Sequence, residues 1–228
     1  MRHTPQYLMT DVDEVKRLIR RNPWTTYVSH TSKGLVASHY ATLLEETDDD
    51  TISIVSHFGR PDEVAHELGQ HEVLVIVQGP HGYISPGWYD ERDFIPTWNH
   101  VTAHLYGVPE LLDESENLRV LSRLVDEFEA PMPTPRSLQL DLDYSARIAK
   151  GTVGLRLRVT RFDARTKLSQ NKAPHVRSRI IDALESDGPY ASAALAAEMK
   201  RVESNSAAVT RAAQRRAQPE QTETNAAG

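Results

Sequence analysis

The segment 78–99 combines the residue types that suit a flat heteroaromatic ligand. Aromatic rings offer a stacking surface, and hydroxyl and amide groups can read the edge of a ring system. The aromatic members are Tyr83, Trp88, Tyr89, Phe94 and Trp98. The polar members between them are His81, Ser85, Thr97 and Asn99. Composition alone favours the alternative, a tightly turned hairpin whose aromatics close one end of a barrel, because buried aromatics most often serve packing.

A second segment, KLSQNK, has the groups that bind a phosphate. Lysines supply point charges, and hydroxyl and amide groups supply hydrogen bonds. The members are Lys167, Ser169, Gln170, Asn171 and Lys172. The alternative is a solvated polar loop after a strand, which is common, and the residues alone favour it.

The histidines do not form a metal-binding pattern. His100 and His104 would share one face of a strand, His66 and His71 flank a helix end, and His57 ends a strand. None has a partner at a zinc spacing and HExxH is missing, so we predict hydrogen-bonded histidines and no metal. GxSxG, GxGxxG and GxxxxGK[ST] are also missing, which disfavours a hydrolase triad and the common nucleotide-phosphate loops.

Composition limits the class of protein. The 228 residues are 39% hydrophobic, enough for a proper core, and carry a net charge of −6. A basic face of the kind that neutralises DNA phosphates is not evident from this balance. Cysteine is absent, so disulfides and thiolate sites are excluded. The first residues lack an apolar signal region and no run could span a bilayer, so we expect a cytoplasmic protein without a membrane partner.

Periodicity predicts one helix and then short strands in the first half of the chain. Residues 10–21 should be helical, with Thr10 as the cap and an apolar face, and Asn22-Pro23 should end the helix. Strands are expected at 25–29, 35–43, 51–56 and 73–78, with a short helix at 61–68 and a turn at Gly79-Pro80.

The second half continues the alternation of short strands and peripheral helices. Strands are expected at 82–85, 99–106 and 153–162, and helices at 110–129, 139–150 and 176–185. From about Ser204 the sequence favours a frayed or disordered tail. These elements predict an α+β fold, an antiparallel split β-barrel with peripheral helices. We expect one domain over 1–186 and an Ala-rich helical or disordered extension over 187–228.

The two polar and aromatic segments resemble motifs of a known family. GPHGYISPGWY, then IPTWNHV, then FDARTKLSQNK resemble the PaiB-type FMN-binding negative transcriptional regulators. An ASH element (residues 37–39) and an HxxR element (57–60) precede them in the same order. The resemblance runs from about residue 7 to about 184. It implies a split barrel related to flavin reductases and pyridoxamine-phosphate oxidases, and a homodimer holding FMN at the subunit interface.

The resemblance also carries over site residues, motif by motif. It implies that Arg60 and Lys167 with their polar neighbours read the phosphate, and that the flavin ring packs near Trp88 and Trp98. The full implied FMN-binding set is His57, Arg60, Ser85, Trp88, Thr97, Trp98, Asn99, Lys167, Ser169, Gln170, Asn171 and Lys172.

Two positions depart from the family pattern. HLARANP is here HFGRPDE, which puts Asp62 where the family has asparagine, and PTWNY is here PTWNH, with His100 for tyrosine. A carboxylate facing the phosphate would weaken FMN binding by repulsion, whereas one that caps the following helix would be neutral.

Three functions stay open on these residues. The first is a flavin-binding regulator, whose DNA binding is implied only by the family name because no helix-turn-helix or basic stripe is evident. The second is an FMN-dependent oxidoreductase. The third is haem binding or breakdown, with His39, His57, His81, His100 and His104 as candidate ligands.

Overall fold

A computed structural model describes residues 4–46 and 50–217, and for 206–217 it describes the backbone alone. The chain divides into two compact units. Unit 1 comprises residues 1–79 and 100–167, and unit 2 comprises residues 80–99 and 168–228. The predicted domain boundary at 186/187 stays a prediction.

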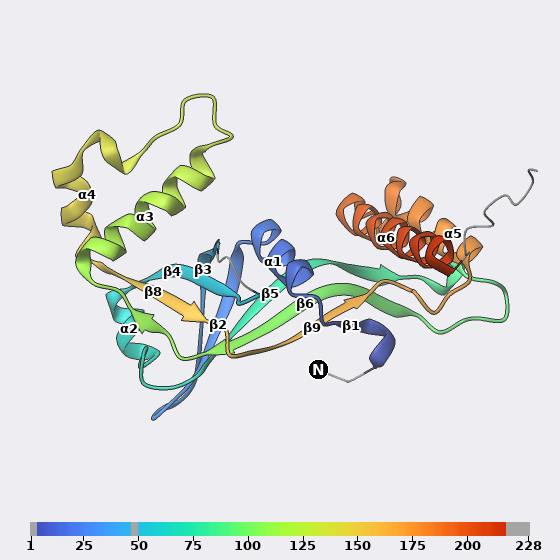
Figure 1. Cartoon of the computed structure of the whole chain (residues 1–228), viewed down its shortest axis with the longest axis horizontal. Coiled ribbons are helices and arrows are strands. Elements are labelled where there is room, and N and C mark those ends of the chain that lie inside the picture. The colour runs from blue at the N-terminus through green and yellow to red at the C-terminus, as the bar shows by residue number, and fades with distance from the viewer. Residues whose placement is uncertain (1–3, 47–49, 218–228) are drawn as a thin grey trace, which may run out of the picture. The chain divides into compact units, whose positions relative to one another are not determined.

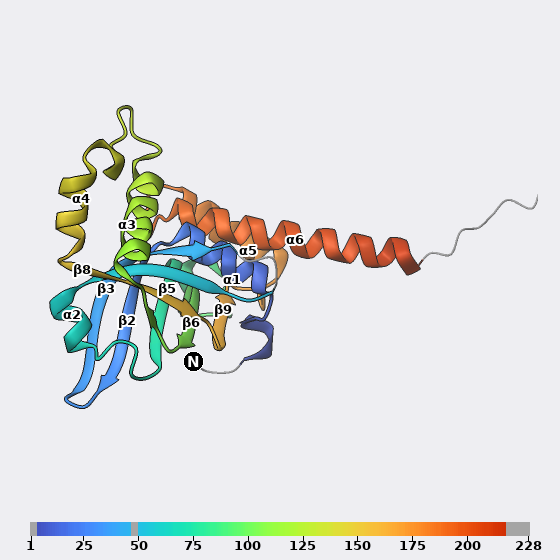
Figure 2. The same ribbon diagram turned by 60° about the vertical axis from the view of Figure 1, so that its left-hand side comes forward.

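Within the described residues, nine strands form one sheet in the order β1-β9-β6-β5-β2-β3-β4-β8-β7. The strands are β1 Leu8–Met9, β2 Trp24–Thr31, β3 Gly34–Glu45, β4 Ser53–Gly59, β5 Val73–Ile84, β6 Thr97–Gly107, β7 Glu110–Leu111, β8 Thr152–Arg158 and β9 Arg161–Lys167. The strand pairs are antiparallel and the sheet curls (Figures 1 and 2). The predicted α+β split barrel is therefore confirmed.

Three of the helices described in unit 1, α1, α3 and α4, begin at aspartate caps that the sequence only partly indicated. The helices described in this unit are η1 Pro5–Tyr7, α1 Val12–Arg21, α2 Arg60–Ala65, α3 Glu114–Glu129, η3 Leu138–Leu140 and α4 Leu142–Ala149. Asp11 rather than Thr10 caps α1, accepting a 2.9 Å hydrogen bond from the Asp13 amide. The predicted helix start at 110 is wrong, because Glu110–Leu111 pairs with β8 and Asp113 caps α3.

Two predicted strand boundaries are also wrong, and close packing explains the first. β5 does not turn at Gly79-Pro80 but continues to Ile84. A Cβ at Gly79 would lie 2.7 Å from Leu18 Cδ1, so this glycine permits a close approach of α1 to the strand rather than a turn.

The strand predicted at 153–162 is two strands, β8 and β9. Between them the Val159 amide donates to the Ile52 carbonyl and the Thr160 amide donates to the Tyr106 carbonyl, both at 2.9 Å. The chain thus leaves the side of β4 and joins β6 at this corner. No glycine or proline marks the corner itself, which is why a turn was not predicted there.

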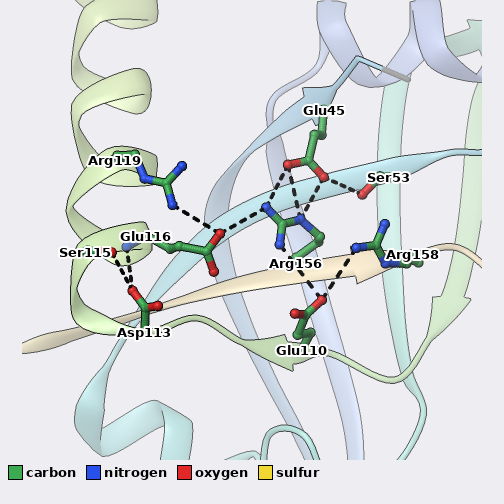
Figure 3. A network of polar contacts seen from close by, with 9 residues as sticks. All are labelled: Glu45, Ser53, Glu110, Asp113, Ser115, Glu116, Arg119, Arg156 and Arg158. Carbon is green, nitrogen blue, oxygen red and sulfur yellow. Dashed lines mark hydrogen bonds and ion pairs between the residues drawn. The ribbon is translucent and has the colours of Figure 1, made fainter. Parts of the chain in front are cut away.

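Unit 1 is held by an apolar core and by an ion-pair network. Val55 on β4 packs with Leu112, Val120 and Leu124 beneath α3. Beside this cluster, Arg156 on β8 forms a bidentate pair with Glu45, 2.8 Å from Nε to Oε2 and 2.9 Å from Nη2 to Oε1 (Figure 3). The network extends to Glu110, Glu116, Arg119 and Arg158 and fastens β8 to β3, β7 and α3.

The described part of unit 2 contains the end of β5, the start of β6 and the helices η2 Pro86–Trp88, α5 Pro174–Glu185 and α6 Ala193–Ala217. Its buried core includes Ile180 and Leu184 on α5 and Leu195 and Met199 on α6. The extension expected to be helical or disordered, and frayed or disordered from about Ser204, is helical as far as Ala217, and residues 218–228 lie outside the described part. Among the helices of the described residues, none is long and apolar enough to cross a membrane.

Candidate functional site

The loop after β9 is joined to the aromatic segment by a buried polar pair in unit 2. The Asn99 amide donates to the Ser169 hydroxyl at 3.0 Å, and that hydroxyl donates to Asn99 Oδ1 at 3.1 Å. Both residues are buried, and Ser169 has a φ of 62°, an uncommon value for a residue other than glycine. The Gln170 side chain accepts a 2.6 Å hydrogen bond from the Leu168 amide. Two motifs far apart in sequence therefore fix each other's backbone.

Lys172 makes contacts within the same unit. Its ammonium is paired with the Asp93 carboxylate and lies 4.2 Å from the centre of the Tyr89 ring. Arg177 donates a 2.6 Å hydrogen bond to the Lys172 carbonyl. The Lys172 contacts hold the segment after η2 against the loop before α5. A role for Lys172 in binding FMN stays a prediction.

The remaining aromatic-segment residues are more accessible. Trp98 is 57% exposed and meets Tyr83 edge-on at a centroid distance of 6.1 Å, while Trp88 is half-buried in η2. Ser85 caps η2 by accepting a 3.1 Å hydrogen bond from the Gly87 amide, and Thr97 is half-buried at the start of β6. Asn171 is exposed beyond the buried Ser169. Trp98 can therefore offer a ring face to a ligand.

In unit 1, His57 and Arg60 lie at the end of β4 and the start of α2. His57 is half-buried, its Nδ1 has no hydrogen-bond partner within the described residues, and burial lowers its pKa. Arg60 is half-exposed, donates to the Lys150 carbonyl at 3.0 Å and pairs with Glu63 at 3.2 Å. These are groups that fit an anionic cofactor, since the guanidinium stays charged and accessible.

Arg60 also lines a cleft of about 650 Å³ in unit 1. Its walls come from α2, β7, α3, α4 and the first residues of β8. Carboxylates of Glu63, Asp113 and Glu114 line it together with the basic Lys150. Three acids disfavour a phosphate dianion inside the cleft, so the accessible face of Arg60 is the better place for one.

Asp62, the first departure from the family pattern, is engaged by hydroxyls. Its carboxylate accepts hydrogen bonds from Tyr40 at 2.7 Å and Ser38 at 3.0 Å. The chain of polar contacts continues from Ser38 to His66 Nε2 at 3.0 Å, and from His66 Nδ1 to Ser29 at 2.8 Å. Burial lowers the pKa of His66. Sequence reasoning placed Ser38 in a family motif but missed Tyr40, which follows it by two residues on the same face of β3.

Within one chain the structure does not bring Arg60 and Lys167 together. β4 and β9 start at the corner formed by Ile52 and residues 159–161, and run from it to Arg60 and to Lys167. In the sheet, β3, β2, β5 and β6 stand between them. Both views show α2 well apart from β9 (Figures 1 and 2). Burial lowers the pKa of Lys167, which is half-buried at the end of β9.

The five candidate haem histidines occupy different settings. His39 stacks near Trp24 and contacts Thr26 at 3.0 Å, while His100, the second departure, contacts Thr102 at 3.3 Å. His104 lies opposite Asp163, and His81 is exposed in unit 2. In the described part of the chain no three His, Asp or Glu side chains converge as a metal site would require.

Comparison with known proteins defines the family. Residues 1–161 match the family described as "Putative FMN-binding domain". The "Protease synthase and sporulation protein PAI 2" of Bacillus subtilis is 30% identical over 196 residues, covering 81% of this chain and 90% of the relative. The chain therefore belongs to this FMN-binding family, as its motifs predicted. It is an FMN-binding protein, and FMN is its cofactor.

Solved structures share the fold at low identity. The "FAD and Heme binding protein" from Mycobacterium smegmatis has a TM-score of 0.51 and 14% identity, over 70% of this chain and 73% of that one. The "Flavocytochrome Anf3" from Azotobacter vinelandii has a TM-score of 0.54 and 13% identity, over 73% and 72%. These likenesses establish the split-barrel fold only.

Proposed function

We propose that this protein is an FMN-binding homodimer with a regulatory output, and that residues of both subunits hold each FMN. The observation that carries this proposal is the separation of Arg60 from Lys167. The family motifs assign both residues to one phosphate, yet β4 and β9 diverge from their common corner. Two copies of the chain can bring an Arg60 and a Lys167 to the same cofactor.

The residues then divide into two sets. His57 and Arg60 act from one subunit, and Lys167 with the loop 168–172 acts from the other. The cations bind the phosphate, and Trp88 and Trp98 orient the ring, whose redox chemistry belongs to FMN itself. The Asn99–Ser169 pair, with its hydrogen bonds of 3.0 and 3.1 Å, keeps the loop in place for this task.

The regulatory output rests on the name of the Bacillus subtilis relative, "Protease synthase and sporulation protein PAI 2". A net charge of −6 gives little electrostatic drive toward DNA, so we expect the output to run through another partner. A gel-shift titration over salt concentration tests this, and salt-sensitive DNA binding would contradict it. Turnover of the bound flavin by a nicotinamide cofactor and a second substrate would instead indicate an oxidoreductase.

Subunit mixing tests the shared site. Arg60→Ala and Lys167→Ala homodimers should each lose FMN. A heterodimer of the two variants, isolated through two different affinity tags, contains one site with both residues intact and one site with neither. It should therefore bind one FMN per dimer with the wild-type affinity, measured by quenching of flavin fluorescence.

The control is Arg119→Ala, because Arg119 is an exposed arginine of unit 1 on α3. This variant should bind two FMN per dimer alone and in mixtures. If Arg60 and Lys167 of the same subunit served one FMN, the mixed dimer would contain no intact site and recovery would be absent. A monomer at micromolar concentration in sedimentation would contradict the proposal directly.

A further inference from the structure

A buried arginine on β9 has two nitrogens without a hydrogen-bond partner. Arg165 is 6% exposed, and its Nε and Nη2 atoms make no hydrogen bond to any residue that the structure describes. A guanidinium stays charged at all physiological pH values, and burying a charge without partners is strongly unfavourable. Such groups are rare in folded proteins and call for a ligand or ion.

The neighbours of Arg165 include hydroxyl, imidazole and ammonium groups toward one end of the strand and the Asp163 carboxylate toward the other, while Leu8 of β1 lies opposite. Thr102 on β6 lies directly opposite Arg165, and His100 lies opposite Lys167. Directly opposite residues of antiparallel strands share a face, as do residues two apart on one strand. Arg165, Lys167, Thr102 and His100 therefore share one face of the β6–β9 pair, where His100 Nδ1 contacts the Thr102 hydroxyl at 3.3 Å.

Acidic groups lie next to the cations on this face of β9. Asp163 lies opposite His104, one step further along the same face, and Arg161 beyond it is paired with Glu72 at 2.7 Å. The cations on this part of the face are Arg165 and Lys167, and the Asp163 carboxylate is as near to Arg165 along the strand as Lys167 is, in a chain whose net charge is −6.

We propose that Arg165, Lys167 and Thr102 bind an oxyanion of the phosphate-monoester class. The Nε and Nη2 atoms of one guanidinium form the fork that grips two oxygens of a phosphate, and the lysine and hydroxyl can reach a third. The phosphate belongs either to FMN or to a second phosphorylated ligand. Only the first case rests on the proposed function.

Titration of flavin-free protein with inorganic phosphate tests the site, at ionic strength held constant with chloride. Wild-type protein should show a saturable rise in unfolding temperature. Arg165→Met should weaken phosphate binding by about tenfold or more, because a charge-assisted bidentate contact is lost. Arg161→Met, on the same face of the same strand but already paired with Glu72, should respond as wild type does.

The variant's own stability separates a ligand-binding arginine from a structural one. Removing an unpartnered buried charge should leave the unfolding temperature of Arg165→Met without phosphate equal to or above that of wild type. A clear fall would show that Arg165 serves the fold and would overturn the proposal. The proposal would also be overturned if phosphate did not raise the unfolding temperature of wild type, or if it raised that of Arg165→Met equally.

Saturation with FMN distinguishes the two sources of phosphate. If FMN abolishes the phosphate response, and Arg165→Met loses affinity for FMN but not for riboflavin, the site holds the FMN phosphate. If the response persists with FMN bound, the site takes a second phosphorylated ligand, and Lys167 then does not serve the FMN phosphate. Because phosphate is titrated without flavin, failure of the dimeric FMN site would leave this result interpretable.

Discussion

The Tyr40 hydroxyl donates a 2.7 Å hydrogen bond to the Asp62 carboxylate, beside the arginine that the family motif assigns to the FMN phosphate. Burial, followed by this hydrogen bond, raises the pKa of Tyr40, so the hydroxyl remains a donor at physiological pH. Ser38 donates to the same oxygen. Asp62 therefore retains two hydroxyls and one negative charge two residues from Arg60.

Asp62→Asn should tighten FMN binding. The asparagine oxygen can still accept from Tyr40 and Ser38, but the repulsion between a carboxylate and a phosphate dianion is removed. Repulsion between two partly screened charges is worth about 1–2 kcal/mol, so its removal should lower the dissociation constant for FMN roughly five- to thirtyfold. Fluorescence titration at low and high salt measures it, and the gain should shrink at high salt.

The matched control for Asp62→Asn is Glu127→Gln, an exposed position on α3. It removes the same global charge, so an equal gain in both variants would mean that only net charge matters. An unchanged or weakened affinity in Asp62→Asn would place the phosphate away from this carboxylate.

Asn99→Ala should destabilise the protein without any flavin present. The change leaves the buried Ser169 hydroxyl without the amide that bonds to it at 3.0 and 3.1 Å. A loss of about 2–3 kcal/mol in the free energy of unfolding is expected, from the unsatisfied hydroxyl and the small cavity. Urea unfolding of Asn99→Ala, Ser169→Ala and the double variant measures the coupling, which should exceed about 0.5 kcal/mol. Additive effects would mean that the pair does not act as a unit.

Tyr89 should make stability fall at alkaline pH. Burial, with the nearby Asp93 carboxylate, raises the pKa of Tyr89 to about 12, and its hydroxyl has no hydrogen-bond partner in the described part of the chain. An unfolded tyrosine has a pKa of about 10. Between these two pH values the unfolded chain ionises at this tyrosine while the folded protein keeps it neutral. The stability that depends on a neutral Tyr89 is therefore fully present below about pH 10 and is lost as the pH rises toward about 12.

Comparison of Tyr89→Phe with wild type in urea at pH 8, 9.5 and 10.5 isolates this tyrosine from the others. The variant should be at least as stable as wild type at pH 8, because a buried hydroxyl without a partner among the described residues is removed, and its advantage should grow as the pH rises. A constant difference between the two proteins across this range would contradict a raised pKa.

Elements whose type depends on local sequence patterns were predictable. The apolar stripe of α3 and the continuous apolar run at the start of β5 predict the correct element types, and the unusual motifs indicate the family. Boundaries set by tertiary contacts were missed. Gly79-Pro80 predicts a turn, whereas Gly79 permits close contact with Leu18, and the corner at residues 159–160 depends on the carbonyls of Ile52 and Tyr106.

The candidate site shows the same division. Residue types at positions such as Asn99 and Ser169 indicated polar chemistry, but the sequence could not show that these two bond to each other. Arg165 was missed because the predicted strand ended at 162, before the alternation that places Arg165 and Lys167 on one face. The Asn99–Ser169 bond and the shared face of Arg165 and Lys167 both depend on which distant segments pair in the fold. The pattern of one sequence does not show that pairing.

Glu45 should contribute to stability at neutral pH and lose its effect in acid. The bidentate hydrogen bonds from Arg156, half-buried in the network of Figure 3, lower the pKa of Glu45. A glutamate in the unfolded chain titrates near 4.3, so the contribution is present above that pH and is lost as the pH falls through the lower folded-state value. Glu45→Gln should lower the free energy of unfolding by about 1–3 kcal/mol at pH 7.

The neighbouring Glu46 is the control for Glu45. Its ion pair with Arg20 lies at the surface, where the Arg20 side chain is 47% exposed and the Glu46 side chain 68% exposed. Glu46→Gln should change stability by less than about 0.5 kcal/mol. In urea unfolding from pH 7 to pH 3, the gap between wild type and Glu45→Gln should close below about pH 4. A gap that persists in acid would mean that Glu45 acts through packing rather than through its charge.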